Sequence, residues 1–311
     1  MEDNKIELPI ESVLSYSRID VFKQCPFRYK LKYIDGNYTD TTSLALQIGT
    51  LLHYANELKY DVNSKMTLDE IWNIVENGYK ADNEDIIGLN DIISEYPFDY
   101  YETDIKNGMT MEDKINKFKI TFYTEVIESE WETIGLEKEF VITFNNKARI
   151  KGFIDRIDRN KTTGDIRVID YKTNGKLYDK KDLATPLQMY IYSLACYEMY
   201  GQYPSDCIYD MLFMCEKQSG GTNGYLNRGF KALNKILDSL IYYQDLGFEY
   251  MKPKPTPLCH WCDYCKTNPN SSDFYNNLCD YHSNWTRENK TFTVNKEWKE
   301  PVSQEDDDWD W

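Results

Sequence analysis

The stretch KGFIDRIDRNKTTGDIRVIDYKT, residues 151–173, contains two runs of β-type residues separated by the turn-forming segment NKTTG. The first run carries Asp155, and the second is apolar until it ends with Asp170 and Lys172. Because side chains alternate along a strand, Asp170 and Lys172 lie on the same face. We therefore expect a pair of strands that brings Asp155 beside Asp170.

This group of polar residues suits one kind of chemistry. Two carboxylates a few ångströms apart form a site for Mg²⁺ or Mn²⁺, because both are hard cations that prefer oxygen ligands. Such a metal holds a phosphate oxygen and lowers the pKa of a bound water, and Lys172 would orient that water or stabilise the pentavalent phosphate. The expected reaction is phosphodiester hydrolysis. Taken alone, Asp170 and Lys172 are more typical of a solvent-exposed ion pair at a strand end, and it is their context that favours a site.

The composition is that of a globular protein. With 311 residues, 41% of them hydrophobic, the chain is long enough for one large domain or two modest ones. It has no apolar stretch of about 18 residues to span a membrane, and its first residues, MEDNKIELPIES, lack the features of a signal peptide. We expect a cytoplasmic protein without a membrane partner; if the resemblance described below reflects a phage-encoded chain, this is the host cytoplasm.

The net charge argues against broad electrostatic attraction to nucleic acid. The chain has 36 Lys+Arg and 52 Asp+Glu, which give a net charge of -16, whereas phosphate binding normally requires a basic surface. The acidic residues are unevenly distributed, since many lie in residues 83–104 and in the final residues EDDDWDW. A local basic groove is therefore compatible with the composition.

Helices and further strands are expected around this pair of strands. Residues 15–34 have helical periodicity, with Ser15 or Ser17 as the cap and a break or bend near Pro26. From about residue 136 the pattern becomes that of β-strands and predicts an antiparallel meander. The other expected elements are a helix carrying His53 at 43–62, a helix at 182–201 that ends at Gly201, a strand at 206–215 and a helix at 225–250.

In their order along the chain, the motifs resemble the PD-(D/E)XK nuclease superfamily, in particular its RecB-like and AddB-like branch. That branch includes phage exonucleases and the CRISPR-adaptation nucleases. The matching pieces are SYSRIDVFKQCPFRYKLKYI, IGTLLHYANE, GFIDRID, VIDYKT, LQMYIYSLA and a cysteine cluster near the C-terminus. The resemblance spans roughly residues 15–280, while residues 64–135 and those after about 285 lie outside it.

The resemblance implies roles for individual residues. His53, Asp155 and Asp170 would bind the metal, and Lys172 would be the catalytic lysine. A lone histidine on a helix is more often a packed or surface residue, so the ligand role of His53 depends on the match of GTLLH.

Three further polar residues are candidates for the catalytic site. Gln188 and Tyr192 are four residues apart on one face of the expected helix at 182–201, and the resemblance implies that both line the catalytic site. Asp158 is the weaker carboxylate, because an offset of three residues along a strand places it on the face opposite Asp155.

The spacing of the cysteines indicates a metal site. Cysteines occur at positions 25, 196, 207, 215, 259, 262, 265 and 279. Two thiolates in a C-x2-C sequence reach one centre from a tight turn, and the Pro- and Asn-rich segment around Cys259 and Cys262 could bury little core by itself. This chemistry leaves zinc and an iron–sulfur cluster open. Cys196, Cys207 and Cys215 lie in apolar runs and are expected to be small buried residues.

The resemblance favours a four-iron four-sulfur cluster. It pairs Cys25, in the CPFRYK context, with Cys259 and Cys262, and the fourth ligand would be Cys279 or else Cys265. The sequence departs from the family pattern here, because two cysteines follow the C-x2-C pair instead of one. The cluster would join distant parts of the chain, and zinc is the alternative.

The terminal sequence VSQEDDDWDW is too acidic to pack and unusually aromatic. Acidic tails that end in aromatic residues resemble those with which replication proteins dock on basic grooves of partners. Two alternatives are a solvated terminus and a tail that covers the DNA channel of the protein itself.

The expected fold is an α/β, restriction-endonuclease-like core, a mixed sheet flanked by helices, with a helical insertion and a cysteine-bound C-terminal patch. The expected divisions are an N-terminal helical part at 1–63, a helical insertion at 64–135, the nuclease core at 136–252, a cysteine segment at 253–285 and an acidic, flexible tail at 286–311.

The expected function is that of a metal-dependent deoxyribonuclease in DNA replication, recombination or repair. The preferred form is an exonuclease that acts on single-stranded DNA or duplex ends. The alternatives are a catalytically inactive DNA-end-binding subunit, an endonuclease and a CRISPR-adaptation nuclease. The complete set Asp155, Asp170 and Lys172 disfavours the inactive subunit.

Overall fold

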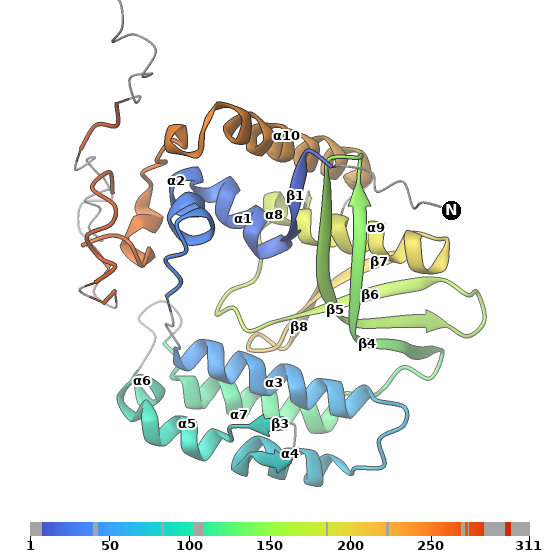
Figure 1. Cartoon of the computed structure of the whole chain (residues 1–311). Helices are drawn as coiled ribbons and strands as arrows, with labels where there is room; N and C mark the ends of the chain where they lie inside the picture. The colour runs from blue at the N-terminus through green and yellow to red at the C-terminus, as the bar shows by residue number, and fades with distance from the viewer. Residues whose placement is uncertain are drawn as a thin grey trace, which may run out of the picture. The chain divides into compact units, whose positions relative to one another are not determined.

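The chain forms two compact units that are described separately. Unit 1 comprises Met1–Thr41, Thr143–Ile150 and Leu233–Trp311, and unit 2 comprises Thr42–Ile142 and Lys151–Ala232. The structure is a computed structural model (Figure 1). It describes residues 8–39, 43–81, 84–102, 108–184, 186–221, 224–268, 271–272, 274–282 and 296–299. The terminal sequence VSQEDDDWDW lies outside the described residues.

A mixed β-sheet is the central element. Its strand order is β1-β5-β6-β7-β8, and β4 also pairs with β5. The strands are β1 (Ile10–Ser15), β4 (Trp131–Phe144), β5 (Ala148–Asn160), β6 (Ile166–Lys172), β7 (Asp206–Met211) and β8 (Glu216–Ser219). β5 is antiparallel to β6, β6 is parallel to β7, and β7 is antiparallel to β8. The mixed α/β class predicted from the sequence is thereby confirmed.

The helices of unit 2 cover this sheet. They are α3 (Leu44–Tyr60), α4 (Leu68–Asn77), α5 (Leu89–Glu95), α6 (Pro97–Tyr101), α7 (Met111–Thr124), α8 (Lys180–Ala184) and α9 (Leu187–Tyr200), and α10 (Tyr225–Leu246) begins here. A two-stranded sheet, β2 (Tyr79–Ala81) with β3 (Glu84–Ile86), lies among them and was not predicted. Over the part of the chain that the structure describes, no helix is both long and apolar enough to cross a membrane.

Helices α3 to α7 share one hydrophobic core with the sheet. Ile48 and Leu52 of α3 and Phe118 of α7 pack in the same buried cluster as Ile169 and Tyr171 of β6. These helices form one layer in Figure 1. Side chains alternate along β6, so Asp170 and Lys172 point to the other face of the sheet, toward α9.

Unit 1 contains the helical segment predicted at 15–34. Ser15 caps α1 (Tyr16–Gln24) by accepting a hydrogen bond from the Arg18 N–H, and Pro26 begins α2 (Pro26–Tyr29). Cys25 between them is extended, because a residue that precedes proline is disfavoured in the helical region. A π-helix (Lys30–Ile34) follows. The predicted break near Pro26 is confirmed, and it isolates Cys25 between two helices.

Three predicted boundaries differ from the structure. The predicted helix at 182–201 is divided into α8 and α9, because Pro186 stands immediately before α9; its predicted end at Gly201 is confirmed. The predicted strand at 206–215 ends at Met211, since the following residues form a turn in which Cys215 has a φ of 54°. The predicted helix at 225–250 ends at Leu246, before Gly247 with a φ of 120°.

Candidate functional site

Strands β5 and β6 bring two carboxylates together. The register pairs Arg156 with Ile169. Because the strands are antiparallel, Asp155, which precedes Arg156, lies opposite Asp170, which follows Ile169. Both side chains are buried, and Asp170 is only 1% exposed. The backbone N–H of Tyr171 donates to Asp155 Oδ2 at 2.7 Å. The antiparallel pairing thus places two acids where the sequence predicted them.

The Asp155 carboxylate is strongly affected by its surroundings. Burial raises the pKa of Asp155 well above its usual value, and the charges of Asp170 and Glu137 raise it further. The hydrogen bond from Tyr171 and the charge of Lys172 act in the opposite direction. A buried carboxylate with a raised pKa beside a second carboxylate forms a site at which a divalent cation would favour the ionised state.

Asp170 is held by three side chains. Lys172 Nζ lies 2.6 Å from Asp170 Oδ2, and Gln188 Nε2 donates to Asp170 Oδ1 at 2.8 Å. The hydroxyl of Tyr192 donates to the same oxygen at 3.3 Å. Gln188 Oε1 in turn accepts a hydrogen bond from Lys172 at 3.1 Å. The i, i+4 pair on α9 therefore contacts the strand that carries Asp170.

The ammonium group of Lys172 stays charged. Burial alone would lower its pKa, but the adjacent Asp170 carboxylate outweighs burial and raises the pKa above the usual lysine value. A permanently protonated lysine at this position is suited to stabilise negative charge on a phosphate, and it is less suited to act as a base.

His53 reaches the same site from α3. Its Nδ1 lies 3.6 Å from Asp155 Oδ2, and its ring packs edge-on against Tyr171 at 5.6 Å between centroids. Burial lowers the pKa of His53, and Lys172 lowers it further, while Asp170 and a hydrogen bond with the Tyr171 backbone oppose the shift. A neutral imidazole is the form that binds a metal.

Glu137 is a site residue that was not predicted. Its carboxylate, the His53 ring and the Asp155 carboxylate each offer a ligand atom, and these atoms lie within 4.8 Å of one another. Burial raises the pKa of Glu137, with Glu57 and Asp170 contributing. Glu137 lies in β4 with a φ of 40°, so simple alternation cannot predict where its side chain points. In the sequence, the feature that could have indicated Glu137 is that it is an acid in the expected strand before the one that carries Asp155.

Asp158 lies outside this group. It forms ion pairs with Arg156 at 3.2 Å and with Arg167 at 3.0 Å, and it accepts a hydrogen bond from Thr133. Its partners are on the sheet face opposite Asp155, as expected from the offset of three residues.

Unit 1 contains a second group of metal-ligand side chains. A single pocket is lined by Cys25, Cys259, Cys262, Cys265 and Cys279. Within it the Cys265 thiol lies close enough to Cys259, Cys262 and Cys279 for these cysteines to raise its pKa, and Cys25 is close enough to interact with Cys262 and Cys279. All five cysteines named from the sequence are therefore brought together.

Consecutive turns arrange the C-terminal thiols. The N–H of Cys262 donates to the carbonyl of Cys259, and the N–H of Cys265 donates to the carbonyl of Cys262. Cys259 lies in a 3₁₀-helix (Pro257–Trp261). Two backbone N–H groups point at sulfur: Lys254 donates to Cys25 at 3.4 Å and Thr256 donates to Cys259 at 3.5 Å. This donor set fits a thiolate-bound metal centre, because N–H donors stabilise the negative charge on sulfur.

The surroundings favour the thiolate of Cys262, whereas burial raises the pKa of Cys25. A hydrogen bond from Cys265 and the nearby Arg28 guanidinium lower the pKa of Cys262, although burial opposes the shift. The three remaining cysteines, Cys196, Cys207 and Cys215, belong to unit 2 and lie outside this pocket.

Comparisons with known proteins show which family the chain is similar to. A family model described as the PD-(D/E)XK nuclease superfamily matches residues 13–267. An ATP-dependent helicase/deoxyribonuclease subunit of Clostridium perfringens is 24% identical over 205 residues, which cover 60% of this chain. The protein of the same name from Streptococcus uberis is 22% identical over 278 residues, or 86% of this chain.

The chain matches only a small part of each of these relatives. The alignments cover 17% of the length of the Clostridium perfringens protein and 24% of the length of the Streptococcus uberis protein. Among solved structures, the crystal structure of SSO0001 is 14% identical with a TM-score of 0.29, covering 75% of this chain and 79% of that one. That likeness is too low to inform the fold.

Proposed function

Because the chain belongs to the PD-(D/E)XK nuclease superfamily, we propose that it is a metal-dependent deoxyribonuclease. The observation that carries this proposal is the assembly of Asp155, Asp170 and Lys172 on two paired strands, with Gln188 bound to both Asp170 and Lys172. A buried carboxylate pair with an adjacent lysine has the donor set for phosphodiester hydrolysis.

The metal would be held by His53, Asp155 and Asp170. Glu137, an exposed acid whose ligand atom lies within 4.8 Å of those of His53 and Asp155, is added to the proposal as a fourth ligand. When bound, Mg²⁺ or Mn²⁺ supplies a Lewis acid and an activated water. The ammonium of Lys172 stabilises charge on the phosphate, because its pKa stays high beside Asp170. Gln188 fixes the orientation of Lys172 through a hydrogen bond of 3.1 Å.

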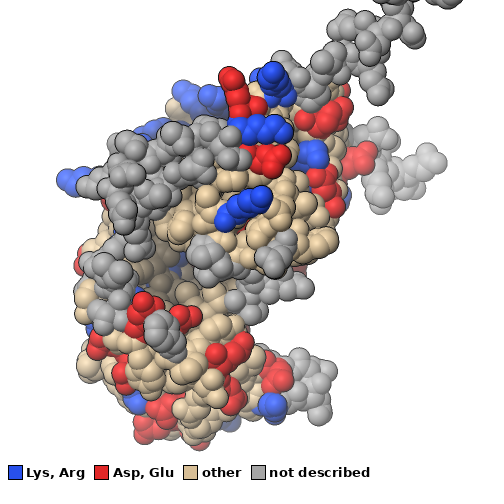
Figure 2. Space-filling model, turned by 90° about the vertical axis from the view of Figure 1, so that its left-hand side faces the viewer, with Lys and Arg blue, Asp and Glu red and all other residues tan. Residues whose placement is uncertain are grey.

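The proposed substrate is DNA, with cleavage from single strands or duplex ends in replication, recombination or repair. The similar proteins are named helicase/deoxyribonuclease subunits, which supports DNA as the substrate class. On the face drawn in Figure 2, basic side chains (blue) occur among acidic ones (red), so the net charge of -16 does not form a uniform acidic coat. We also propose that a replication or recombination protein binds residues 302–311.

Two segments of unit 1 provide a local basic surface. They are 16–34 and 251–268, and they lie side by side, because the Phe27 N–H donates to the Lys252 carbonyl and Lys254 Nζ donates to the Lys23 carbonyl. Their charged residues are Arg18, Lys23, Arg28, Lys30, Lys32, Lys252, Lys254 and Lys266, against Asp20 and Asp263. Although Lys30 is paired with Asp35 at 2.7 Å, this local excess of positive charge supports DNA binding despite the overall composition.

The decisive experiment uses anaerobically purified protein and three labelled DNAs: a linear single strand, a linear duplex and a closed single-stranded circle. Each is incubated with Mg²⁺, with Mn²⁺ and with a chelator. An exonuclease degrades the linear DNAs with metal and spares the circle, whereas an endonuclease cuts the circle. Retarded migration of linear DNA without any cleavage would indicate the inactive end-binding subunit.

For the cysteine pocket we propose a four-iron four-sulfur cluster held by Cys25, Cys259, Cys262 and Cys279, with Cys265 as the alternative fourth ligand. The support is that these thiols line one pocket and that N–H groups donate to two of them. The proposed role is architectural. Iron and sulfide analysis of anaerobic protein tests it, because colourless protein with one zinc per chain would establish the alternative.

A further inference from the structure

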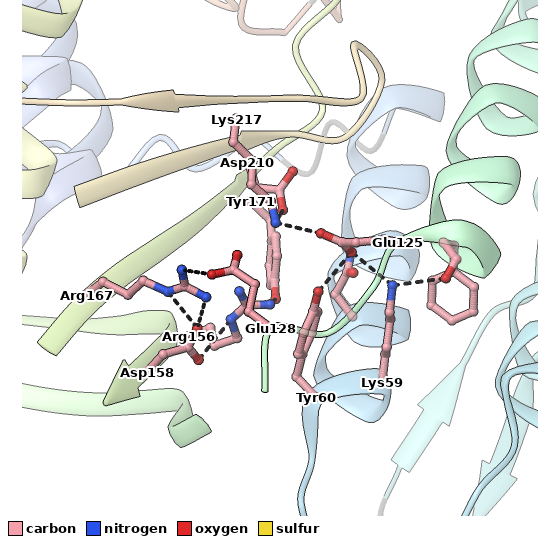
Figure 3. Close-up of polar contacts among 12 residues, drawn as sticks. Lys59, Tyr60, Glu125, Glu128, Arg156, Asp158, Arg167, Tyr171, Asp210 and Lys217 are labelled. Atoms are coloured by element: carbon pink, nitrogen blue, oxygen red, sulfur yellow. Dashed lines mark hydrogen bonds and ion pairs between the residues drawn. The ribbon is translucent and has the colours of Figure 1, made fainter. Parts of the chain in front are cut away.

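A buried polar network lies on the sheet face opposite the catalytic carboxylates. Arg156 pairs with Ile169 across the strands, so it points away from Asp155 and Asp170 and into the side covered by α3. The network includes Arg156, Asp158 and Tyr171, which Figure 3 shows close together, with Tyr60 beyond them. None of these side chains is needed as a metal ligand in the proposed function.

Tyr171 is the residue that joins this network to the site. It stands between Asp170 and Lys172, and its N–H donates to Asp155 Oδ2 at 2.7 Å. Its backbone also forms a hydrogen bond with His53, and its ring packs against the His53 ring. Both Asp155 and His53, proposed metal ligands that come from outside β6, are therefore in direct contact with Tyr171.

The Tyr171 side chain is anchored on the far face. Its hydroxyl accepts a hydrogen bond from Arg156 Nη1 at 3.1 Å. The Arg156 side chain is almost completely buried, pairs with Asp158 at 3.2 Å and stacks over the Tyr60 ring at 3.7 Å. A buried guanidinium requires its acceptors, so the position of the Tyr171 hydroxyl is closely restrained.

We propose that Tyr171, held by Arg156, is a positioning residue for the metal site. The restraint on the hydroxyl fixes the ring and the backbone of residue 171, and that backbone orients the Asp155 carboxylate and the His53 imidazole. Outer partners of metal ligands act in this way by fixing ligand orientation before the ion arrives. The inference depends on the proposed metal site, and it adds a role for residues that touch neither metal nor substrate.

The test is Mn²⁺ affinity, measured by titration without DNA, for the full chain. The key variant is Tyr171→Phe, which removes only the hydroxyl. Tyr225→Phe is the matched control, because it also removes a partly buried hydroxyl in unit 2, one that is hydrogen-bonded to Ser193 at 2.7 Å. Asp155→Ala defines the binding that belongs to other parts of the chain.

We expect Tyr171→Phe to bind Mn²⁺ about tenfold more weakly than the wild type. This is the lower end of the loss in metal affinity that is typical when a residue that orients a metal ligand is changed. Tyr225→Phe should bind as the wild type does. Arg156→Lys keeps the buried charge but lacks the planar fork that reaches both Asp158 and Tyr171, so it should show a similar loss. The double variant should lose little more than either single one, because both changes remove the same contact.

Unchanged Mn²⁺ affinity in Tyr171→Phe and Arg156→Lys, with a wild-type site that Asp155→Ala abolishes, would overturn the inference. A lower melting temperature alone would also contradict it, since a merely structural contact affects stability without changing metal affinity. Equal Mn²⁺ binding by the wild type and Asp155→Ala would instead contradict the proposed metal site itself, and the inference with it.

Discussion

The carboxylate site of unit 2 and the cysteine pocket of unit 1 both assemble metal-ligand side chains from distant segments, but on different kinds of backbone. Asp155 and Asp170 lie on paired strands and His53 on a long helix, so ladder and helix hydrogen bonds fix their spacing. Cys25 and Cys259 lie at a helix break and in a 3₁₀-helix. Regular elements hold a site rigidly, whereas turns leave more of the restraint to the bound group.

The two sites also differ in how charge is balanced. Lys172 is paired with Asp170 at 2.6 Å, so part of the negative charge of the carboxylate site is compensated by the protein itself. In the cysteine pocket, compensation comes from backbone N–H groups and from Arg28, which lowers the pKa of Cys262 together with a hydrogen bond from Cys265. We therefore expect unit 2 to fold without its metal and unit 1 to depend on its bound group.

The largest effect is expected from Asp170→Asn. Removing the charge of Asp170 should slow metal-dependent DNA cleavage by at least about 10³-fold, because this carboxylate is proposed to hold the metal at the reaction centre. The fold should persist, as circular dichroism can show, because the amide keeps the volume of the buried side chain. Asp165→Asn is the matched control: it alters an exposed acid that precedes β6 and should leave the rate unchanged.

The cysteine pocket should show the opposite pattern, with a loss of stability. Cys25→Ala should abolish iron binding and lower the melting temperature by on the order of 5 °C or more, because a bound centre stabilises the folded state only while it is held. Cys215→Ala, outside the pocket, should retain the metal. Retention of a full cluster by Cys25→Ala would contradict the proposed dependence of unit 1 on its bound group. Comparing iron binding by Cys265→Ala and by Cys279→Ala would identify the fourth ligand.

Metal binding at the carboxylate site should depend on pH. Burial and the charge of Asp170 raise the pKa of Asp155, so protons compete with metal at pH values above the usual aspartate range. Mn²⁺ affinity should fall as the pH is lowered through that raised pKa, by about tenfold per unit for one released proton. An affinity that is constant down to about pH 4.5 would show that the acid has its usual pKa.

The smallest effect concerns Asp210, a buried acid in unit 2 outside the metal-ligand group. Burial raises the pKa of Asp210 to about 6. The folded state therefore binds the proton more tightly than the unfolded chain, so ionisation destabilises the fold as the pH rises between about 4 and about 6. Asp210→Asn should add about 1–2 kcal/mol to the free energy of unfolding at pH 8 and little at pH 4. A gain that does not change with pH would contradict this account.

The residues that could be predicted are those on regular elements. Alternation along β5 and β6 placed Asp155, Asp170 and Lys172, because a strand has only two faces. The spacing of Gln188 and Tyr192 on a helix correctly predicted that they share one face, and they are hydrogen-bonded to each other at 2.9 Å. Elements of this kind convert sequence spacing directly into position in space.

The residues that were missed depend on tertiary contacts. Glu137 reaches the metal-ligand group through a positive φ within β4, which breaks the alternation on which the prediction depended. The pairing of β5 and β6 was expected, but the hydrogen bond from Arg156 to the Tyr171 hydroxyl depends on side-chain packing that no local pattern reveals. The choice between Cys265 and Cys279 was left open for a related reason, because both lie among turns, where spacing in sequence does not determine distance.

The most direct test of the central claim is the single-turnover rate of end-labelled DNA cleavage in Mn²⁺ for the wild type, Lys172→Met and Lys161→Met. Lys161 is an exposed lysine in the turn between β5 and β6 and serves as the matched control. We predict that chelator stops the wild type, that Lys161→Met cleaves at the wild-type rate and that Lys172→Met is slower by about 10³-fold although it still binds Mn²⁺. Wild-type cleavage by Lys172→Met, or cleavage that persists in chelator, would contradict the claim.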